Sequence, residues 1–281
     1  MNKISEKFYN LIEMHYLKEF TRNLGEIEIL DDRINCYVDN DKLKQYLSDH
    51  RNYLLLGKYK KPKELLKNIN KPVYFIIENM KFNSELEVCG DDYDNNCCIE
   101  FRNCFFTSNL LFNRLKSIIF KENIFSNNIE LVDYYFLKMI DNIEFINNNF
   151  CFIYNEKNPY PTSFRMEIRA QNMKFINSKF HYPKIFSRIW LYVKNIEISN
   201  SELYGDFLCL ISSNIKRSNS RLCFNQVRIE ETNSNYNKLN VSDIEASSIL
   251  YNDIKILKDE NDKYYIDYSD EEKSSKTKIY K

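Results

Sequence analysis

Three stretches of this chain repeat one pattern: DNIEFINNNF at residues 141–150, QNMKFINSKF at 171–180 and KNIEISNSEL at 194–203. In each stretch apolar and polar residues alternate, an Asn-bearing break interrupts the alternation, and another apolar residue follows. Alternation with a period of two is typical of a strand with one buried side. Asn is typical of a tight turn, because it tolerates left-handed backbone and hydrogen-bonds within its own turn. The repeat therefore predicts a strand, a short turn and a second strand.

Looser copies extend the pattern over much of the chain. The first apolar residues of the seven copies are Met80, Ile99, Ile118, Ile143, Met173, Ile196 and Leu222. Repeats of roughly 20–30 residues with strand content predict a solenoid, because each unit can bury its apolar side only against its neighbours.

This pattern resembles the right-handed parallel β-helix class, with a likeness to irregular pentapeptide-like repeat proteins. The resemblance covers about residues 73–230, and it implies a mainly β fold of about six or seven irregular coils. It implies no particular activity, since one fold hosts many functions. An antiparallel β-sandwich is the alternative, because short strands with turn signals also fit that class.

Stacked coils predict columns of equivalent side chains about 4.8 Å apart. The expected inward columns are Ile143/Met173/Ile196, Phe145/Phe175/Ile198 and Phe150/Phe180/Leu203. The expected outward column, Glu144/Lys174/Glu197, alternates in sign and so avoids like-charge contacts. Two Asn columns are expected at corners, where stacked amides bond one another: Asn142/Asn172/Asn195 and Asn147/Asn177/Asn200.

Three segments are predicted: an α/β cap at residues 1–72, the solenoid at 73–257 and a flexible or loosely docked tail at 258–281. Apolar spacing within the cap predicts helices at 4–24, 41–49 and 63–68. A strand pair is expected at 26–38, with Asp31 and Asp32 in the turn.

Composition excludes several classes of protein. The 40 basic and 40 acidic residues balance, which argues against nucleic-acid binding along the whole chain but leaves local patches open. The abundance of Asn, Ile, Lys, Phe and Tyr is typical of an AT-rich genome, so single Asn or Lys residues carry little weight. We expect no signal peptide and no membrane span, because the first residues lack an apolar core and no apolar run reaches 18 residues. A cytoplasmic protein with eight reduced Cys is the expectation.

The strongest candidate site is an outward strand surface before the Asn turn. Alignment on the turn predicts that Met166, Ile168 and Ala170 point inward, in register with Ile189, Leu191 and Val193. The opposite, outward set is Arg165, Glu167 and Arg169 with Arg188, Trp190 and Tyr192, continued one coil earlier by Leu137 and Met139. Trp, Tyr and Arg anchor many interfaces, and Arg can lie over an aromatic ring. The alternative is that an insertion such as 155–164 covers the aromatic rings.

A second candidate lies in the Lys-rich segment 51–71, where lysines could contact phosphates and tyrosines could stack on bases. The residues concerned are Tyr53, Lys58, Tyr59, Lys60, Lys61 and Lys63. The alternative is a solvated surface of the cap.

Metal binding and catalysis have weaker support. Cys89, Cys97, Cys98 and Cys104 could supply four thiolates, but their spacing is unlike the C-x2-C of zinc sites, so we expect buried thiols and no metal or cofactor. The chain has no phosphate-binding Gly loop and no G-x-S-x-G motif.

A glycan-active enzyme is a third hypothesis, in which an acidic loop acts together with Glu167 or Arg169. The loop carboxylates are Asp91, Asp92 and Asp94. The sequence favours a non-catalytic interaction protein that recognises a protein partner.

Overall fold

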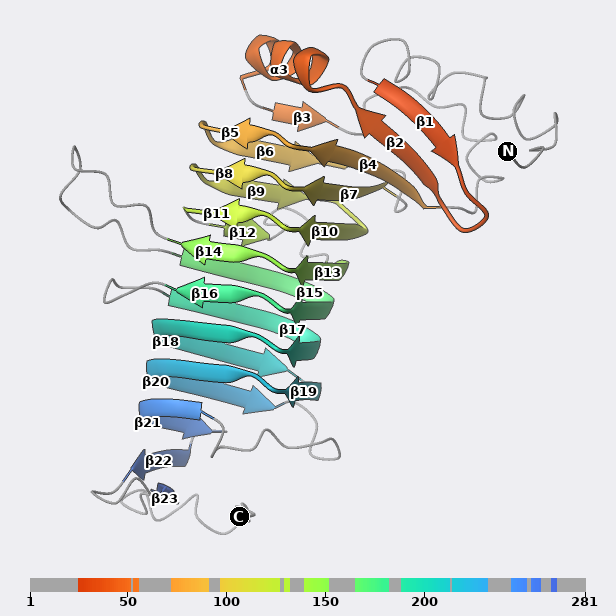
Figure 1. The fold of residues 1–281 in the computed structure, drawn as a ribbon. Coiled ribbons are helices and arrows are strands. Elements are labelled where there is room, and N and C mark those ends of the chain that lie inside the picture. Colours follow the sequence, from red (N-terminus) through yellow and green to blue (C-terminus); the bar gives the residue numbers. More distant parts are fainter. Residues whose placement is uncertain are drawn as a thin grey trace, which may run out of the picture.

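The computed structural model describes residues 25–51, 53–55, 72–90, 97–126, 129–131, 139–151, 165–181, 188–212, 214–231, 244–251, 254–258 and 264–266. Within these residues the chain winds into a β-solenoid of about five turns, close to the expected number (Figure 1). The neighbouring strands of the stack run parallel, so the antiparallel sandwich alternative is wrong. The helices expected at 4–24 and 63–68, and the tail beyond residue 266, lie outside the described residues.

Each turn of the solenoid passes through three faces of stacked strands. Face 1 contains β4 (Val73–Glu78), β7 (Cys97–Arg102), β10 (Ser117–Lys121), β13 (Ile140–Ile146), the second halves of β15 (Arg165–Ile176) and β17 (Arg188–Ser199), and β19 (Asn214–Ser218). Face 2 contains β5 (Lys81–Phe82), β8 (Phe105–Phe106), β11 (Ile124–Phe125), β14 (Asn149–Cys151), β16 (Lys179–His181) and the first halves of β18 (Glu202–Ser212) and β20 (Arg221–Glu231).

Face 3 completes the turn. It contains β6 (Leu86–Cys89), β9 (Leu110–Asn113), β12 (Ile129–Leu131), the first halves of β15 and β17, and the second halves of β18 and β20. β21 (Ile244–Tyr251) pairs with β20 along both faces 2 and 3.

The register confirms the predicted columns. The three inward columns pair as expected, and every member is at most 2% exposed. The outward column Glu144/Lys174/Glu197 pairs as expected and continues to Lys216, so its signs alternate over four coils. The Asn142/Asn172/Asn195 column forms an amide ladder, with Nδ2-to-Oδ1 distances of 3.1 and 2.8 Å.

Stacked phenylalanine rings fill the interior between faces 1 and 2. The face 1 column is Phe101, Phe120, Phe145 and Phe175, and the face 2 column is Phe82, Phe106, Phe125, Phe150 and Phe180. Neighbouring rings within a column lie 4.7–5.5 Å apart between centroids. Burial of each ring contributes about 1.5–3 kcal/mol, so these columns are a main source of cohesion between coils.

The corner between faces 1 and 2 has the same backbone in every described coil. One residue adopts positive φ, between 46° and 58°, at Asn79, Asn103, Glu122, Asn147, Asn177, Asn200 and Asn219. The column Asn147/Asn177/Asn200 is thus confirmed as a left-handed corner, which Asn tolerates better than most residues. The N–H of each of the first six donates to a carbonyl of the next coil; for Asn147 the acceptor is the Ile176 oxygen, at 2.9 Å.

A buried polar ladder, which was not predicted from the sequence, follows the left-handed residue. We name this set the corner ladder: Asn123, Asn148, Ser178, Ser201 and Ser220. Each side-chain oxygen accepts the corner N–H of the coil before it, over 2.8–3.2 Å. The first four members also donate to a carbonyl of that coil; the Asn148 Nδ2, for example, donates to the Phe120 oxygen. The first four members are at most 2% exposed.

Two of the seven predicted copies are out of register. Phe75, and not Met80, pairs with Ile99, so the first copy begins five residues earlier than predicted. Leu222 pairs with Leu203 on face 2, whereas the residue that pairs with Ile196 is Ile215, which begins a copy that the prediction missed. Both errors have one cause: apolar residues alternate on either side of the corner, so a short match can align face 2 with face 1.

The coil before β15 also differs from the prediction. Glu130, and not Leu137, pairs with Glu167, because β12 occupies that position on face 3. The sulfur of the half-buried Met139 instead accepts a hydrogen bond from the Gln171 Nε2, at 3.3 Å. Leu137 lies outside the described residues. Counting back from the turn fails here because this coil carries an insertion between face 3 and face 1.

Antiparallel strands close the stack at both ends. At the N-terminal end β1 (Gly25–Ile29) pairs antiparallel with β2 (Ile34–Val38), as predicted, and β2 pairs parallel with β4. At the other end β22 (Ile254–Lys258) and β23 (Tyr264–Ile266) reverse direction after β21. The reversed strands end the parallel stacking on one face at each end, face 1 at the N-terminal end and face 3 at the other. The boundaries predicted at residues 72 and 257 stay predictions.

One helix is described, α3 (Asn40–Asp49), which confirms the helix expected at 41–49. Asp39 caps its N-terminus, because one carboxylate oxygen accepts the N–H groups of Asp41 and Lys42 at 3.0 Å. The helix buries Leu43 and Leu47 against the first coil. β3 (Tyr53–Leu55) then pairs with β6 on face 3.

The corner ladder generates a stability prediction. We expect Asn148→Ala to lower the free energy of unfolding by about 2–4 kcal/mol, because it removes the acceptor of the buried Asn123 N–H and a donor to the Phe120 carbonyl. Asn172→Ala is the matched control, since it removes an exposed ladder amide, and we expect less than about 1 kcal/mol. Urea unfolding followed by circular dichroism measures both changes. Equal losses in the two variants would contradict the role given to the corner ladder.

Candidate functional site

The six residues of the predicted partner-binding site lie together on the outside of face 3. Arg165 pairs with Arg188, Glu167 with Trp190 and Arg169 with Tyr192. Side chains alternate along a strand, and the intervening residues, such as Ile168 and Leu191, are buried inside. The predicted inward and outward sets are therefore both confirmed in their register.

Glu167 is the centre of this group, although its side chain is only 7% exposed. Its Oε2 accepts from the Arg165 Nη2 at 2.5 Å, and its Oε1 accepts from the Arg169 Nη2 at 3.1 Å. A buried carboxylate is stable only when cations and hydrogen bonds replace its water. The two flanking arginines supply both, and Glu167 in turn fixes where they lie.

Each of these arginines also lies over an aromatic ring of the next coil. The Arg165 Cζ is 5.1 Å from the centroid of the Trp190 ring, and the Arg169 Cζ is 5.0 Å from that of Tyr192. Contacts of this kind contribute about 0.5–1 kcal/mol at exposed sites and more when water is excluded. The two arginine side chains remain 45% and 40% exposed, so they still face solvent.

One further coil extends the group beyond the predicted residues. Phe207, Cys209 and Ile211 pair with Arg188, Trp190 and Tyr192, and the rings of Trp190 and Phe207 lie 6.0 Å apart. We name these nine outward residues the face 3 surface: Arg165, Glu167, Arg169, Arg188, Trp190, Tyr192, Phe207, Cys209 and Ile211. The last three were not predicted; they belong to the run FLCLI from 207 to 211, which pairs in full with residues 188–192.

A second arginine–glutamate pair borders this surface. Arg228 on β20 pairs in register with Cys209, and its Nη2 forms an ion pair with Glu230. The aromatic and apolar part of the face 3 surface thus lies between two ion-paired groups. Burial raises the pKa of Tyr192, with smaller contributions from Cys209 and Glu167, so this phenol stays protonated at neutral pH.

The chemistry of the face 3 surface suits binding better than catalysis. Both oxygens of Glu167 are engaged by arginines, so this carboxylate is poorly placed to accept a proton from a substrate. The surface presents to a ligand guanidinium groups that are held in fixed positions beside the edges of aromatic rings.

A second buried carboxylate lies on the outside of face 1, and sequence reasoning missed it. The Oε1 of Glu100 accepts from Arg102 and Lys121, at 2.7 Å each, and Arg102 also pairs with Glu78 at 2.8 Å. Burial alone raises the pKa of Glu100, but the hydrogen bonds from Arg102 and Lys121 outweigh it and leave that pKa lowered. Glu100 is therefore ionised at neutral pH and contributes to an ion-pair network. The only sequence signal is its position in a column between two Ile residues.

Of the two other candidate sites, the structure describes only Tyr53. Lys58, Tyr59, Lys60, Lys61 and Lys63 lie outside the described residues, as do Asp91, Asp92 and Asp94. Tyr53 begins β3, where it pairs with Glu87 of face 3. The nucleic-acid and glycan hypotheses stay predictions.

The eight cysteines are free thiols, and six of them are buried. Cys97 packs in the core, and the neighbouring Cys98 points to the opposite side of β7. Burial raises the pKa of Cys98 to about 12 and that of Cys104 to about 11. Among the described residues, no three metal-ligating side chains come together.

Comparison of the sequence with protein-family models, curated proteins and solved structures finds no match. In the part of the chain that the structure describes, no helix has the length and apolar character needed to cross a membrane.

The raised thiol pKa values predict selective labelling. At pH 8 we expect iodoacetamide to modify Cys104 about 100-fold more slowly than an ordinary thiol, because a pKa of about 11 instead of 9.0 leaves about 100-fold less thiolate. The half-exposed Cys151 and Cys223 should react first. Mass spectrometry of peptides from native protein, with urea-unfolded protein as the control, measures each rate. Labelling of Cys104 as fast as Cys223 would contradict its burial.

Proposed function

We propose that this protein is a non-catalytic interaction protein that recognises a protein partner through the face 3 surface. The observation that supports the proposal best is the arrangement of Arg165 and Arg169, which one buried carboxylate holds over two aromatic rings. Such an arrangement fixes the arginines before any partner arrives. Fixed side chains lose less conformational entropy on binding, and this favours affinity.

The residue types support the same conclusion. Trp, Tyr and Arg dominate the few residues that contribute most of the binding energy at protein interfaces. Trp190 and Tyr192 are half-buried in the free chain, so their edges remain available to a partner. The interior of the solenoid has its own apolar columns, so the ion pairs and cation–π contacts outside it are additional to the core.

The face 3 surface is too small to form a whole protein–protein interface, so we expect it to be the central part of a larger one. Three coils at about 4.8 Å spacing and strands of five residues at about 3.3 Å each span roughly 15 by 17 Å. That area is roughly 250 Å², whereas a standard interface buries about 800 Å² per partner. The partner is therefore expected to contact neighbouring coils as well, with the face 3 surface near the centre.

Trp190→Ala tests the proposal. We expect the full-length chain to retain a protein from a lysate of its own cells, and the Trp190→Ala variant to lose it, because the ring supports Arg165 and presents its edge outward. A loss of about 2 kcal/mol or more, roughly thirtyfold in Kd, is typical of such an anchor. Quantitative mass spectrometry of the retained proteins measures this ratio, and circular dichroism checks the fold.

Ile124→Ala is the matched control, because Ile124 is an exposed apolar residue on face 2. It should leave the partner bound. Retention of the same partner by Trp190→Ala and by the native chain would refute the proposal. A partner that is lost on nuclease treatment would favour the nucleic-acid hypothesis instead.

A further inference from the structure

The N-terminal end of the solenoid is closed on two faces by strands and on the third by a helix. β2 pairs with β4 on face 1, and β3 pairs with β6 on face 3. Above β5 on face 2 lies α3 (Figure 1). The backbone groups of a helix bond within the helix, so α3 covers this end without pairing with the edge of β5.

The edge of β5 that faces α3 therefore has no strand beside it in the described structure. Phe105 N–H donates to the Met80 carbonyl at 2.9 Å, and Thr107 N–H donates to that of Phe82 at 3.0 Å, so both carbonyls point toward β8. Backbone groups of successive strand residues point to opposite sides, which turns the N–H and C=O of Lys81 toward α3. β5 pairs with β8 alone among the described strands. An unpaired strand edge is a template for an added strand.

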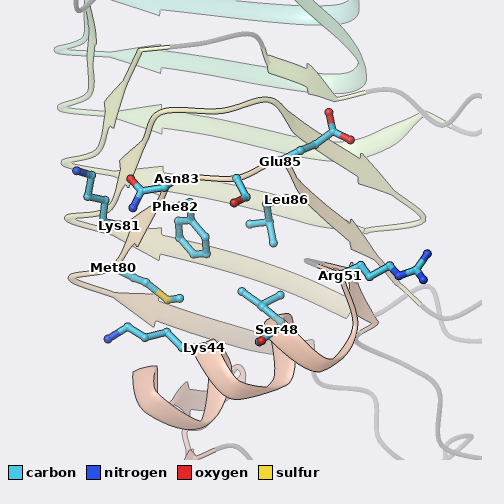
Figure 2. A pocket seen from close by; sticks show the side chains of 11 residues that line it. Lys44, Ser48, Arg51, Met80, Lys81, Phe82, Asn83, Glu85 and Leu86 are labelled. Carbon is cyan, nitrogen blue, oxygen red and sulfur yellow. The ribbon is translucent and has the colours of Figure 1, made fainter.

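A cavity of about 410 Å³ lies between α3 and this edge. Its floor is apolar, and Figure 2 shows the ring of Phe82 and the side chain of Leu86 facing the space. Lys44 and Lys81 lie at one side of it and Arg51 lies at the other. A volume near the lower end of the range for ligand sites admits a few residues of extended chain and excludes a folded domain.

The rim of the cavity carries three cations against one carboxylate. The cations are Lys44, Arg51 and Lys81, and the carboxylate is Glu85. Among the described residues Lys44 pairs only with Asp41, at 3.3 Å and at an exposed position where such pairs contribute little. Glu85 accepts from the Asn109 amide at 3.2 Å. The rim therefore attracts acidic groups.

We propose that this cavity binds an acidic, extended peptide segment of a partner protein, which adds a short strand to β5. The segment bonds the N–H and C=O of Lys81, places an apolar side chain over Phe82 and Leu86, and brings carboxylates to Lys44 and Arg51. Strand addition of this kind draws affinity from main-chain hydrogen bonds and specificity from side-chain pockets. The site is separate from the face 3 surface and does not depend on it.

Selection from a library of random octapeptides displayed on phage, with the full-length chain as bait, tests this inference. We expect the selected peptides to be rich in Asp and Glu and to alternate these with apolar residues. The best one, made synthetically, should slow amide hydrogen exchange at Lys81, measured by NMR. Selection of no peptide, or of peptides without acidic residues, would overturn the proposal. So would unchanged exchange at Lys81.

Charge reversal locates the binding. The variant K44E/R51E/K81E should weaken the synthetic peptide on the order of tenfold or more in Kd, because like charges then face each other. The matched control reverses three exposed lysines elsewhere on the solenoid, Lys174, Lys179 and Lys216, and should leave Kd within about twofold. Equal weakening in both variants would overturn the site. A single-stranded octanucleotide that displaces the peptide would also overturn it, in favour of a nucleic-acid ligand.

Discussion

Each turn of this solenoid depends on a backbone N–H that is buried at the corner after face 1. A sharp corner cannot satisfy that group within its own coil, and water does not reach it. The side-chain oxygen of Asn123, Asn148, Ser178, Ser201 or Ser220, one coil further along, accepts it. An unsatisfied buried donor costs about 1–3 kcal/mol, so the corner ladder fixes the register of neighbouring coils. The phenylalanine columns add to the attraction between coils, but apolar burial by itself does little to specify their register.

Fixed register has consequences for the outside of the molecule. Once the coils stack in one alignment, an outward side chain lies diagonally next to the side chain of the following coil that is two positions further along the strand. Arg165 contacts Trp190 in this way. The same stacking must stop somewhere. Two faces stop at strands of the N-terminal segment, whereas face 2 stops at α3, which leaves an open edge beside Lys81. The face 3 surface and the cavity beside β5 are thus both consequences of the way the coils stack.

Periodicity alone predicted most of the fold and the register of six of the nine residues of the face 3 surface, because the apolar pattern recurs in the three copies at 141–150, 171–180 and 194–203. It could not predict the corner ladder, since one buried position holds Asn in two coils and Ser in three, and both residues also suit an ordinary turn. It misplaced Leu137, because an insertion breaks the count. The burial of Glu167 was also unpredictable, since it depends on two arginines closing over the carboxylate.

Hydrogen exchange at the corner amides tests the central claim most directly. The account predicts that the N–H groups of Cys104, Asn123, Asn148, Ser178 and Ser201 exchange only through global unfolding, with the free energy that urea unfolding gives. NMR of deuterated full-length protein measures these rates residue by residue. Exchange at the rates of solvent-exposed turn amides, while strand amides such as that of Phe145 stay protected, would show that the corner ladder does not hold the coils together.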